Sequence, residues 1–403
     1  MKPHVLLSGA LAAGALSLSG CGADRPSASS TTQATAAAQA AARSEAAGTT
    51  GGLYVQRNLV SNVAGLAEHL DPNLVNSWGI THRGTSPWWV SDNGTGVATL
   101  YDGEGVAQFG IPPLVVNVTG AGGAPAAPTG VVANTGTGFV VSSGGAEGPA
   151  FFIFASEDGT ISGWNPNVPP PVPPATRSTT TIVVVDNSSP NPLGGAVYKG
   201  ITIASAESGE RLYATDFRGA KVDVFDDTFA PVSTTGGFAD PSLPAGYAPF
   251  GIRAIDGTIY VTYALQDAAK HDDVAGKHHG FVNAFTPDGV LLARIASGGK
   301  LDSPWGLAMA PASGFGRFSG KLLVGNFGDG HIVGYAVEEE QRQGDGGAYL
   351  TGKGGRITID GLWGLGFGND AAAGPSDVLF FAAGPNDESD GLFGRIDFQH
   401  GNE

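Results

Sequence analysis

The sequence predicts an all-β fold, a six-bladed β-propeller whose ring is closed by an N-terminal strand that joins the last blade. Of the 403 residues, 64 are Gly and 26 are Pro, and both types interrupt helices. A Gly followed by an aliphatic residue recurs six times, about 50 to 70 residues apart, and a segment with strand-like alternation follows each one. Repeats of this length, with roughly four short strands each, are typical of propeller blades.

The chain begins with an export signal over residues 1–20, in which an apolar run too short to span a bilayer follows Lys2. The segment Leu-Ser-Gly-Cys at 18–21 resembles the lipobox of bacterial lipoproteins. That resemblance implies that Cys21 is acylated and becomes the first residue of the mature chain. We therefore expect an exported lipoprotein of the cell envelope, held in the outer membrane if the host has one. The alternative is an ordinary secretory signal in which Cys21 is incidental.

Residues 21–52 are rich in Ala, Ser and Thr and contain almost no large apolar side chains. Such a segment buries too little surface to offset its ordering entropy, so we expect a flexible tether. The third part, 53–403, carries the repeats and forms the predicted propeller.

Six anchors define the blades. They are Trp78-Gly79-Ile80, Thr129-Gly130-Val131, Lys199-Gly200-Ile201, Phe250-Gly251-Ile252, Trp305-Gly306-Leu307 and Trp363-Gly364-Leu365. After each anchor comes a strand rich in β-branched or aromatic residues: WWVSD at 88–92, FVVSS at 139–143, LYATD at 212–216, IYVTY at 259–263, LLVGN at 322–326 and VLFFA at 378–382. The longest interval contains the proline run Pro169–Pro174, which we interpret as a loop insertion. The segment LYVQRNLVSNV at 53–63 has no anchor of its own and is expected to supply the outer strand of the last blade.

The segment at 200–226, with Leu-Tyr-Ala-Thr-Asp and Lys-Val-Asp-Val-Phe-Asp, resembles an NHL-type propeller repeat. The whole of 53–403, with DPNLVNSWGI at 71–80 and SPWGLA at 303–308, resembles an uncharacterised family of exported bacterial propellers. That resemblance implies a fold and no activity. The architecture is more distantly similar to gluconolactonase-like and streptogramin-lyase-like propellers, which hold a divalent metal in the channel; no residue-by-residue match transfers their catalytic groups.

The residues that end the second strand of each unit are expected to meet around the channel. They are Asp92, Ser143, Asp216, Tyr263, Asn326 and Ala383. Asp92, Asp216 and Asn326 belong to alternate blades and carry the oxygen ligands that a cation such as Ca²⁺ prefers. These three residues are candidate metal ligands. Asp and Asn also cap strand ends by binding turn amides, and that structural interpretation stays open.

The segment QDAAKHDDVAGKHHG is a long insertion between two strands of the fourth unit. Its His271, His278 and His279, together with the adjacent Asp272 and Asp273, are candidates for binding Zn²⁺ or a ligand, or for acid–base chemistry above the channel. A solvated surface loop is the competing interpretation.

Trp78, Trp305 and Trp363 each precede an anchor Gly, which makes them candidates for stacking on a sugar or another flat ligand. The competing interpretation is that they pack between blades, with Phe250 in the same place in the fourth unit.

A formal charge of −16 argues against nucleic acid or an anionic membrane surface as the main partner. The sequence contains no nucleophile elbow and no phosphate-binding loop before a helix. We expect a monomeric binding or interaction scaffold that engages a small molecule or an envelope protein. The alternatives are a hydrolase or lyase that uses a divalent cation such as calcium in the channel, and a structural envelope protein.

Overall fold

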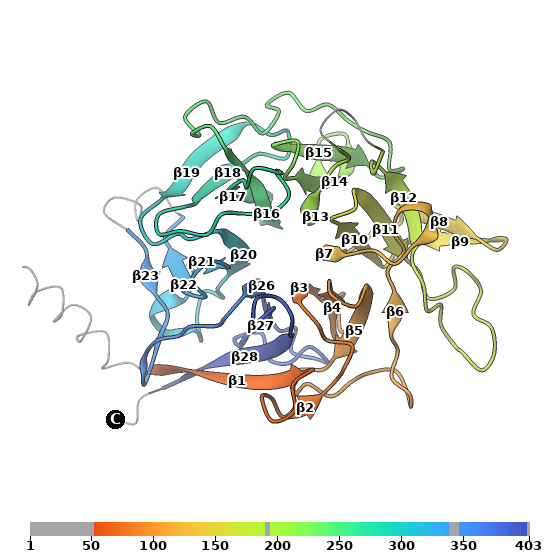
Figure 1. Ribbon diagram of the computed structural model, residues 1–403, viewed down its shortest axis with the longest axis horizontal. Coiled ribbons are helices and arrows are strands. Elements are labelled where there is room, and N and C mark those ends of the chain that lie inside the picture. The colour runs from red at the N-terminus through yellow and green to blue at the C-terminus, as the bar shows by residue number, and fades with distance from the viewer. Residues whose placement is uncertain (1–51, 190–193, 338–345, 401–403) are drawn as a thin grey trace, which may run out of the picture. The chain divides into compact units, whose positions relative to one another are not determined.

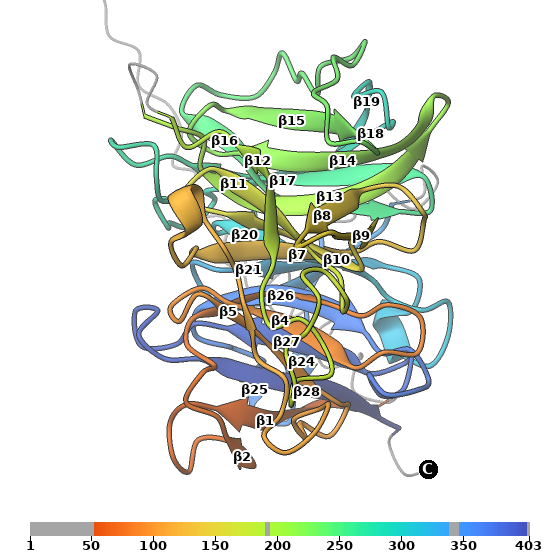
Figure 2. The same cartoon turned by 90° about the vertical axis from the view of Figure 1, so that its right-hand side faces the viewer.

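The computed structural model describes residues 52–189, 194–337 and 346–400. The signal peptide, the tether up to residue 51 and Cys21 lie outside the described residues. The described part forms a ring of six antiparallel sheets around a central axis (Figure 1), with loops emerging on both faces of the ring (Figure 2). The six-bladed propeller predicted from the sequence is confirmed. Within the described ranges, no helix is long and apolar enough to cross a membrane.

Each blade is built outward from the axis. The innermost strands are β3 (Ser77–Thr81), β7 (Pro128–Ala133), β13 (Tyr198–Ala206), β16 (Tyr247–Ile255), β20 (Pro304–Met309) and β26 (Leu362–Phe367). The second strands are β4 (Trp88–Asp92), β10 (Phe152–Ser156), β14 (Gly209–Asp216), β17 (Thr258–Leu265), β21 (Leu322–Asn326) and β27 (Leu379–Ala383). The third strands are β5 (Val97–Tyr101), β11 (Thr160–Trp164), β15 (Lys221–Asp226), β18 (Phe281–Phe285), β22 (Ile332–Tyr335) and β28 (Leu392–Gln399).

The outermost strands are more variable. They are β6 (Val116–Asn117), β12 (Ile182–Asp186), β19 (Leu291–Ser297), β23 (Ala348–Tyr349) and β1 (Leu53–Ser61) in blades one, two, four, five and six. The sheet of blade three has three strands within the described residues. Short elements complete the chain: β2 (His69–Leu70) pairs with β1, β24 (Thr351–Gly352) pairs with β25 (Gly355–Arg356), and single 3₁₀ turns occupy Ala121–Gly123 and Gly316–Phe318.

The ring closes as the sequence predicts. The strand β1 runs antiparallel to β28, from Leu53 opposite Gln399 to Ser61 opposite Leu392. Blade six is therefore made from both ends of the described chain, and its order is β1-β28-β27-β26 with β2 beyond β1. Pairing along nearly the whole of β1 covers the edge that β28 would otherwise expose.

Blade two departs from the sequence-based assignment. The segment FVVSS at 139–143 is not its second strand, because β8 (Val140–Ser143) pairs only with β9 (Ala146–Pro149) in a separate hairpin at the rim of the ring (Figure 1). The second strand is β10, which pairs with β7 on one side and β11 on the other. The proline run lies in the loop between β11 and β12, as predicted. The residue equivalent to Asp92 is consequently Ser156 and not Ser143.

The anchor glycines allow neighbouring innermost strands to approach one another closely. A Cβ atom on Gly251 would lie 2.1 Å from the carbonyl oxygen of Trp305, and one on Gly306 would lie 2.4 Å from that of Trp363. Each anchor therefore meets the backbone of the next blade, where any side chain would clash. This contact explains why a Gly recurs at the same place in all six repeats.

Candidate functional site at the channel mouth

The six residues that directly precede the anchor glycines meet around the axis. They are Trp78, Thr129, Lys199, Phe250, Trp305 and Trp363. Five of these side chains are uncharged, and Lys199 is the exception. The structure therefore places one cation in a ring of otherwise apolar or weakly polar groups.

The three tryptophans pack against one another and form an aromatic plug on the axis. The rings of Trp78 and Trp363 are stacked with centroids 3.5 Å apart, and Trp305 meets both edge-on at 5.9 and 5.7 Å. Phe327 stacks on Trp363 at 4.0 Å. The tryptophans are 1–8% exposed and share one apolar cluster with Phe250. Their ring faces are thus used in packing between blades, and a ligand-stacking role for them stays a prediction without support from this geometry.

Lys199 lies over the plug with its ammonium held between two carboxylates. Its side chain is 2% exposed; Nζ forms an ion pair with Oε1 of Glu157 and lies 3.2 Å from Oδ1 of Asp272. Nζ also lies 5.1 Å from the centroid of the Trp78 ring, within cation–π range. Burial alone would lower the pKa of Lys199, but the charges of Glu157 and Asp272 outweigh burial and raise the pKa above its usual value. The amine is therefore a protonated, fixed positive charge.

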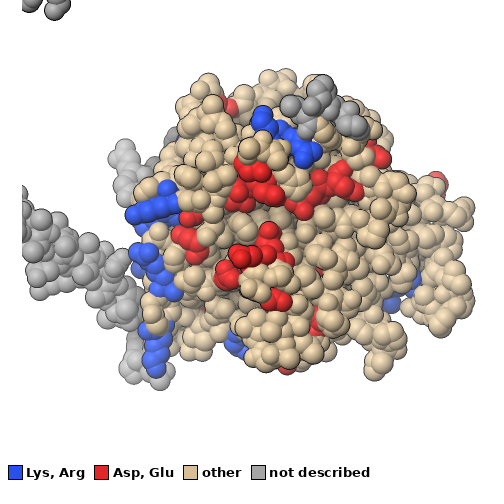
Figure 3. Space-filling model, in the orientation of Figure 1, with Lys and Arg blue, Asp and Glu red and all other residues tan. Residues whose placement is uncertain are grey.

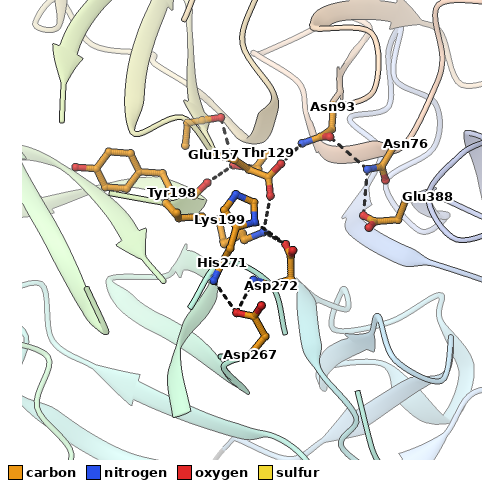
Figure 4. Close-up of polar contacts among 12 residues, drawn as sticks. Asn76, Asn93, Thr129, Glu157, Tyr198, Lys199, Asp267, His271, Asp272 and Glu388 are labelled. Atoms are coloured by element: carbon orange, nitrogen blue, oxygen red, sulfur yellow. Dashed lines mark hydrogen bonds and ion pairs between the residues drawn. The ribbon is translucent and has the colours of Figure 1, made fainter. Parts of the chain in front are cut away.

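Polar contacts run from Lys199 through neighbouring blades and form a continuous arc around the mouth (Figure 4). Glu157 accepts a hydrogen bond of 2.9 Å from the amide of Asn93, and the amide of Asn76 donates to Asn93 and, at 3.0 Å, to Glu388. With Lys199 and Asp272 these residues define what we call the polar arc. It joins blades six, one, two, three and four. Burial raises the pKa of Glu388 above its usual range.

The loop between β17 and β18 supplies the fourth-blade end of the polar arc. The carboxylate of Asp267 accepts hydrogen bonds from the backbone N–H groups of His271 (2.8 Å) and Asp272 (3.3 Å). This turn directs both side chains to the mouth, where His271 Nδ1 lies 2.9 Å from Asp272 Oδ1. Their hydrogen bond raises the pKa of His271 and lowers that of Asp272.

The three predicted histidines are separated by the structure. His271 contacts Asp272 of the polar arc. In contrast, His278 Nδ1 binds the carbonyl oxygen of Gly299, and His279 Nδ1 binds that of Val274. The latter two are exposed loop residues held by backbone carbonyls. Among the described residues, one group of three His or acidic side chains has ligand atoms within 4.8 Å of one another, namely Glu157, His271 and Asp272.

Asp92, Asp216 and Asn326 end equivalent strands, as predicted, but each binds groups of its own blade. Asp92 accepts a hydrogen bond of 2.8 Å from the Thr99 hydroxyl, and its pKa is raised well above the usual value by burial. Asp216 accepts hydrogen bonds from the backbone N–H groups of Val197 and Gly219, and burial raises the pKa of its carboxyl as well. The Asn326 amide donates to the Lys300 carbonyl oxygen and to Asp329. These contacts fit the strand-capping interpretation, and a shared metal site formed by the three residues stays a prediction.

Two central residues of the polar arc were missed by sequence reasoning. Glu157 directly follows β10, so it occupies the place in blade two that Asn93 occupies in blade one. Assigning 139–143 as the second strand hid that equivalence. Lys199 precedes the Gly of the third anchor, and the equivalent residue of every other blade is uncharged. This difference was the sequence signal that could have identified Lys199 as a site residue.

The mouth is acidic on a larger scale. Figure 3 shows Asp and Glu side chains gathered around the middle of this face, while the visible Lys and Arg side chains lie further out. Such a distribution attracts positively charged solutes towards the axis and repels anions. The Lys199 ammonium offsets only part of the local negative charge.

Comparison with known proteins gives a family and a fold. No protein-family model matches the chain. A solved protein of unknown function from Bacteroides thetaiotaomicron superposes with a TM-score of 0.51 and 11% identity over 86% of this chain and 76% of its own, which is a likeness of fold. A gluconolactonase from Xanthomonas campestris gives a TM-score of 0.38 and 19% identity over 62% of this chain and 72% of its own.

Two relatives are close enough in sequence to define a family. Both are uncharacterised proteins of Acanthamoeba polyphaga mimivirus. One is 31% identical over 345 residues, which cover 84% of this chain and 78% of the relative. The other is 32% identical over 348 residues, which cover 84% of each. The chain belongs to the same family of six-bladed β-propellers as these uncharacterised mimivirus proteins.

Proposed function

We propose that this protein is a binding propeller that engages a small, positively charged ligand at the channel mouth, on the polar arc. The observation that carries the proposal is the buried ammonium of Lys199 between Glu157 and Asp272. Packing of the ring does not require it, because the equivalent position of every other blade carries an uncharged residue. A buried charge held between two carboxylates at one end of the ring is a candidate for a functional group.

The ligand class follows from the donors and acceptors. Glu157, Asp272 and Glu388 present carboxylate oxygens, and within the described ranges the Lys199 ammonium is the one Lys or Arg group paired with the first two. Carboxylates bind amines and guanidinium groups by charge-assisted hydrogen bonds. A primary or secondary amine therefore fits this mouth better than an anion does, and the surrounding acidic groups increase its rate of encounter.

The test is titration calorimetry of the full chain with putrescine and spermidine, and with glucose as an uncharged control, at low and high salt. We expect the amines to bind, with affinity that falls as salt rises. The variant Glu157→Gln should weaken binding at least tenfold, while Glu207→Gln, which changes an exposed acid in the turn between β13 and β14, should leave it unchanged. Equal amine binding by both variants, or binding of glucose alone, would contradict the proposal.

A second candidate function is a metal-dependent hydrolase or lyase, favoured by the group of Glu157, His271 and Asp272. Carboxylate oxygens and an imidazole nitrogen are suitable ligands for a divalent cation. The Lys199 ammonium, however, contacts the same two carboxylates, so this donor set already holds a cation supplied by the chain. Elemental analysis of the purified full chain separates the two functions: a stoichiometric divalent ion, lost in Asp272→Asn, would favour the enzyme.

We further propose that the protein is exported and anchored through Cys21, as the lipobox-like segment implies. The sequence before the propeller supports this part of the proposal. Mass spectrometry of the mature protein from its native host tests it. We expect a diacylglyceryl mass on an N-terminal Cys21, and none in the Cys21→Ser variant. An unmodified N-terminus would instead favour a secreted, unanchored binding protein or a structural envelope protein.

A further inference from the structure

A second polar feature lies on the axis, separate from the polar arc. The innermost strands of all six blades line a cavity of about 170 Å³, and Trp305 is one of its lining residues. Its walls are glycine backbone, aliphatic side chains such as Ile80 and Val131, and the polar side chain of Thr202. The single charged residue in this lining is Arg253, from β16. We call this space the arginine cavity.

Arg253 reaches across the channel. Its Nη1 atom donates a hydrogen bond of 2.8 Å to the carbonyl oxygen of Leu365, so the side chain extends from blade four to blade six. A guanidinium has five N–H donors, and this contact uses one of them. Among the described residues, no carboxylate lies within ion-pair distance of Arg253. The remaining donors therefore have no acidic partner in that part of the chain.

The electrostatics agree with an uncompensated charge. Burial lowers the pKa of Arg253, and no acid in the described part of the chain opposes this effect. The charge also reaches His82, whose pKa is lowered mainly by burial and further by Arg253. His82 donates through Nε2 to the carbonyl oxygen of Phe367, 3.0 Å away, and its buried Nδ1 has no partner among the described residues. An anion beside the guanidinium would offset the charge of Arg253, including its effect on His82.

We propose that the arginine cavity is a binding site for a small monocarboxylate, held by the guanidinium of Arg253. The planar fork of a guanidinium matches the two oxygens of a carboxylate. A single negative charge balances the single cation, whereas a phosphate dianion would leave a second charge unpaired. The volume equals that of about five or six waters at ~30 Å³ each, which suits a short aliphatic acid. This site does not depend on the polar arc.

The test uses the full chain, with sodium propionate as the probe and sodium chloride and sodium phosphate at equal ionic strength as comparisons. We expect propionate to raise the Tm progressively and [1-¹³C]propionate to show a broadened carboxyl resonance, with much smaller effects of chloride and phosphate. Arg253→Met should weaken binding at least tenfold. Arg177→Gln, which alters an arginine packed on Phe109 outside the cavity, should not change it.

The same variant gives an independent readout. Because Arg253→Met removes a partly buried charge that has no acidic partner among the described residues, we expect its Tm in carboxylate-free buffer to equal or exceed that of the wild type. Should Arg253→Met fail to fold, Arg253→Lys keeps the charge but not the fork and should still bind propionate more weakly. Unchanged propionate binding in a folded Arg253 variant, or equal Tm shifts with all three salts, would overturn the proposal.

Discussion

The indole N–H of Trp305 donates a 2.9 Å hydrogen bond to the backbone carbonyl of Lys199, from blade five to blade three. The contact passes beside the axis without involving blade four. It connects the aromatic plug to Lys199, whose ammonium is part of the polar arc. The backbone position of the buried ammonium thus depends on an aromatic side chain two blades away.

Trp305→Phe removes this hydrogen bond and keeps most of the ring contacts. We expect a loss of about 1 kcal/mol in the free energy of unfolding. Trp305→Ala also empties part of the plug and should cost about 3–5 kcal/mol. Denaturant unfolding of both variants measures the two effects. Equal stability of the two variants would show that the plug contributes little to the ring.

Lys199→Met leaves Glu157 and Asp272 facing each other without a cation. Breaking a buried ion pair in this way should cost about 3–5 kcal/mol near neutral pH. The folded-state pKa of Asp272 is depressed, so its stabilisation is present above the unfolded pKa and is lost as the pH falls. The difference between wild type and variant should therefore shrink only as the pH falls below about 4, where the unfolded chain takes up the proton first.

Unfolding by denaturant at several pH values measures this difference. The double variant Lys199→Met, Glu157→Gln serves as the control. It removes one of the two negative charges that face each other, so it should recover part of the lost unfolding free energy. If the difference in unfolding free energy between wild type and Lys199→Met stays constant with pH, the lost stability comes from packing and not from charge.

Asp92→Asn should stabilise the protein at neutral pH. Oδ1 of Asp92 is buried without a hydrogen-bond partner among the described residues, and burial raises the pKa of this carboxyl. A carboxyl whose folded-state pKa is raised loses stability as the pH rises above its unfolded pKa, about 3.8. The gain in Tm should thus be larger at about pH 8 than at about pH 4. A fall in Tm together with loss of bound calcium would instead favour the predicted metal site.

Gly251→Ala should prevent normal ring packing, because the new Cβ would lie 2.1 Å from the Trp305 carbonyl oxygen. We expect a loss of more than about 4 kcal/mol or an insoluble product. Gly354→Ala is the matched control, since nothing lies within 4 Å of its Cβ position. The measurement is soluble yield followed by thermal unfolding. A stable Gly251→Ala protein would contradict the close-approach explanation of the anchors.

The fold was predictable because the features that indicate it are local in the sequence. They are the six anchors, the alternation of the strands, and the segment at 53–63 that has no anchor of its own. The second strand of blade two was not predictable, since FVVSS has the alternation of a blade strand and only tertiary pairing places it in an outer hairpin. That error concealed Glu157. The loop histidines show the same limit: backbone hydrogen bonds to Asp267 select His271 for the mouth, and no spacing rule distinguishes it from His278.

The pairing of β1 with β28 also determines when the ring can form during synthesis. Residues 53–61 are synthesised before every other strand of the described ring, whereas their partner, 392–399, is synthesised after all the others. Until then β1 has no antiparallel neighbour, and blade six cannot be completed. Blades one to five can assemble progressively from neighbouring segments, whereas closure requires the contact of highest sequence separation and comes last. A nascent chain stopped before Leu392 would therefore keep an open edge on β27, and its β1 strand would be available to pair with another chain.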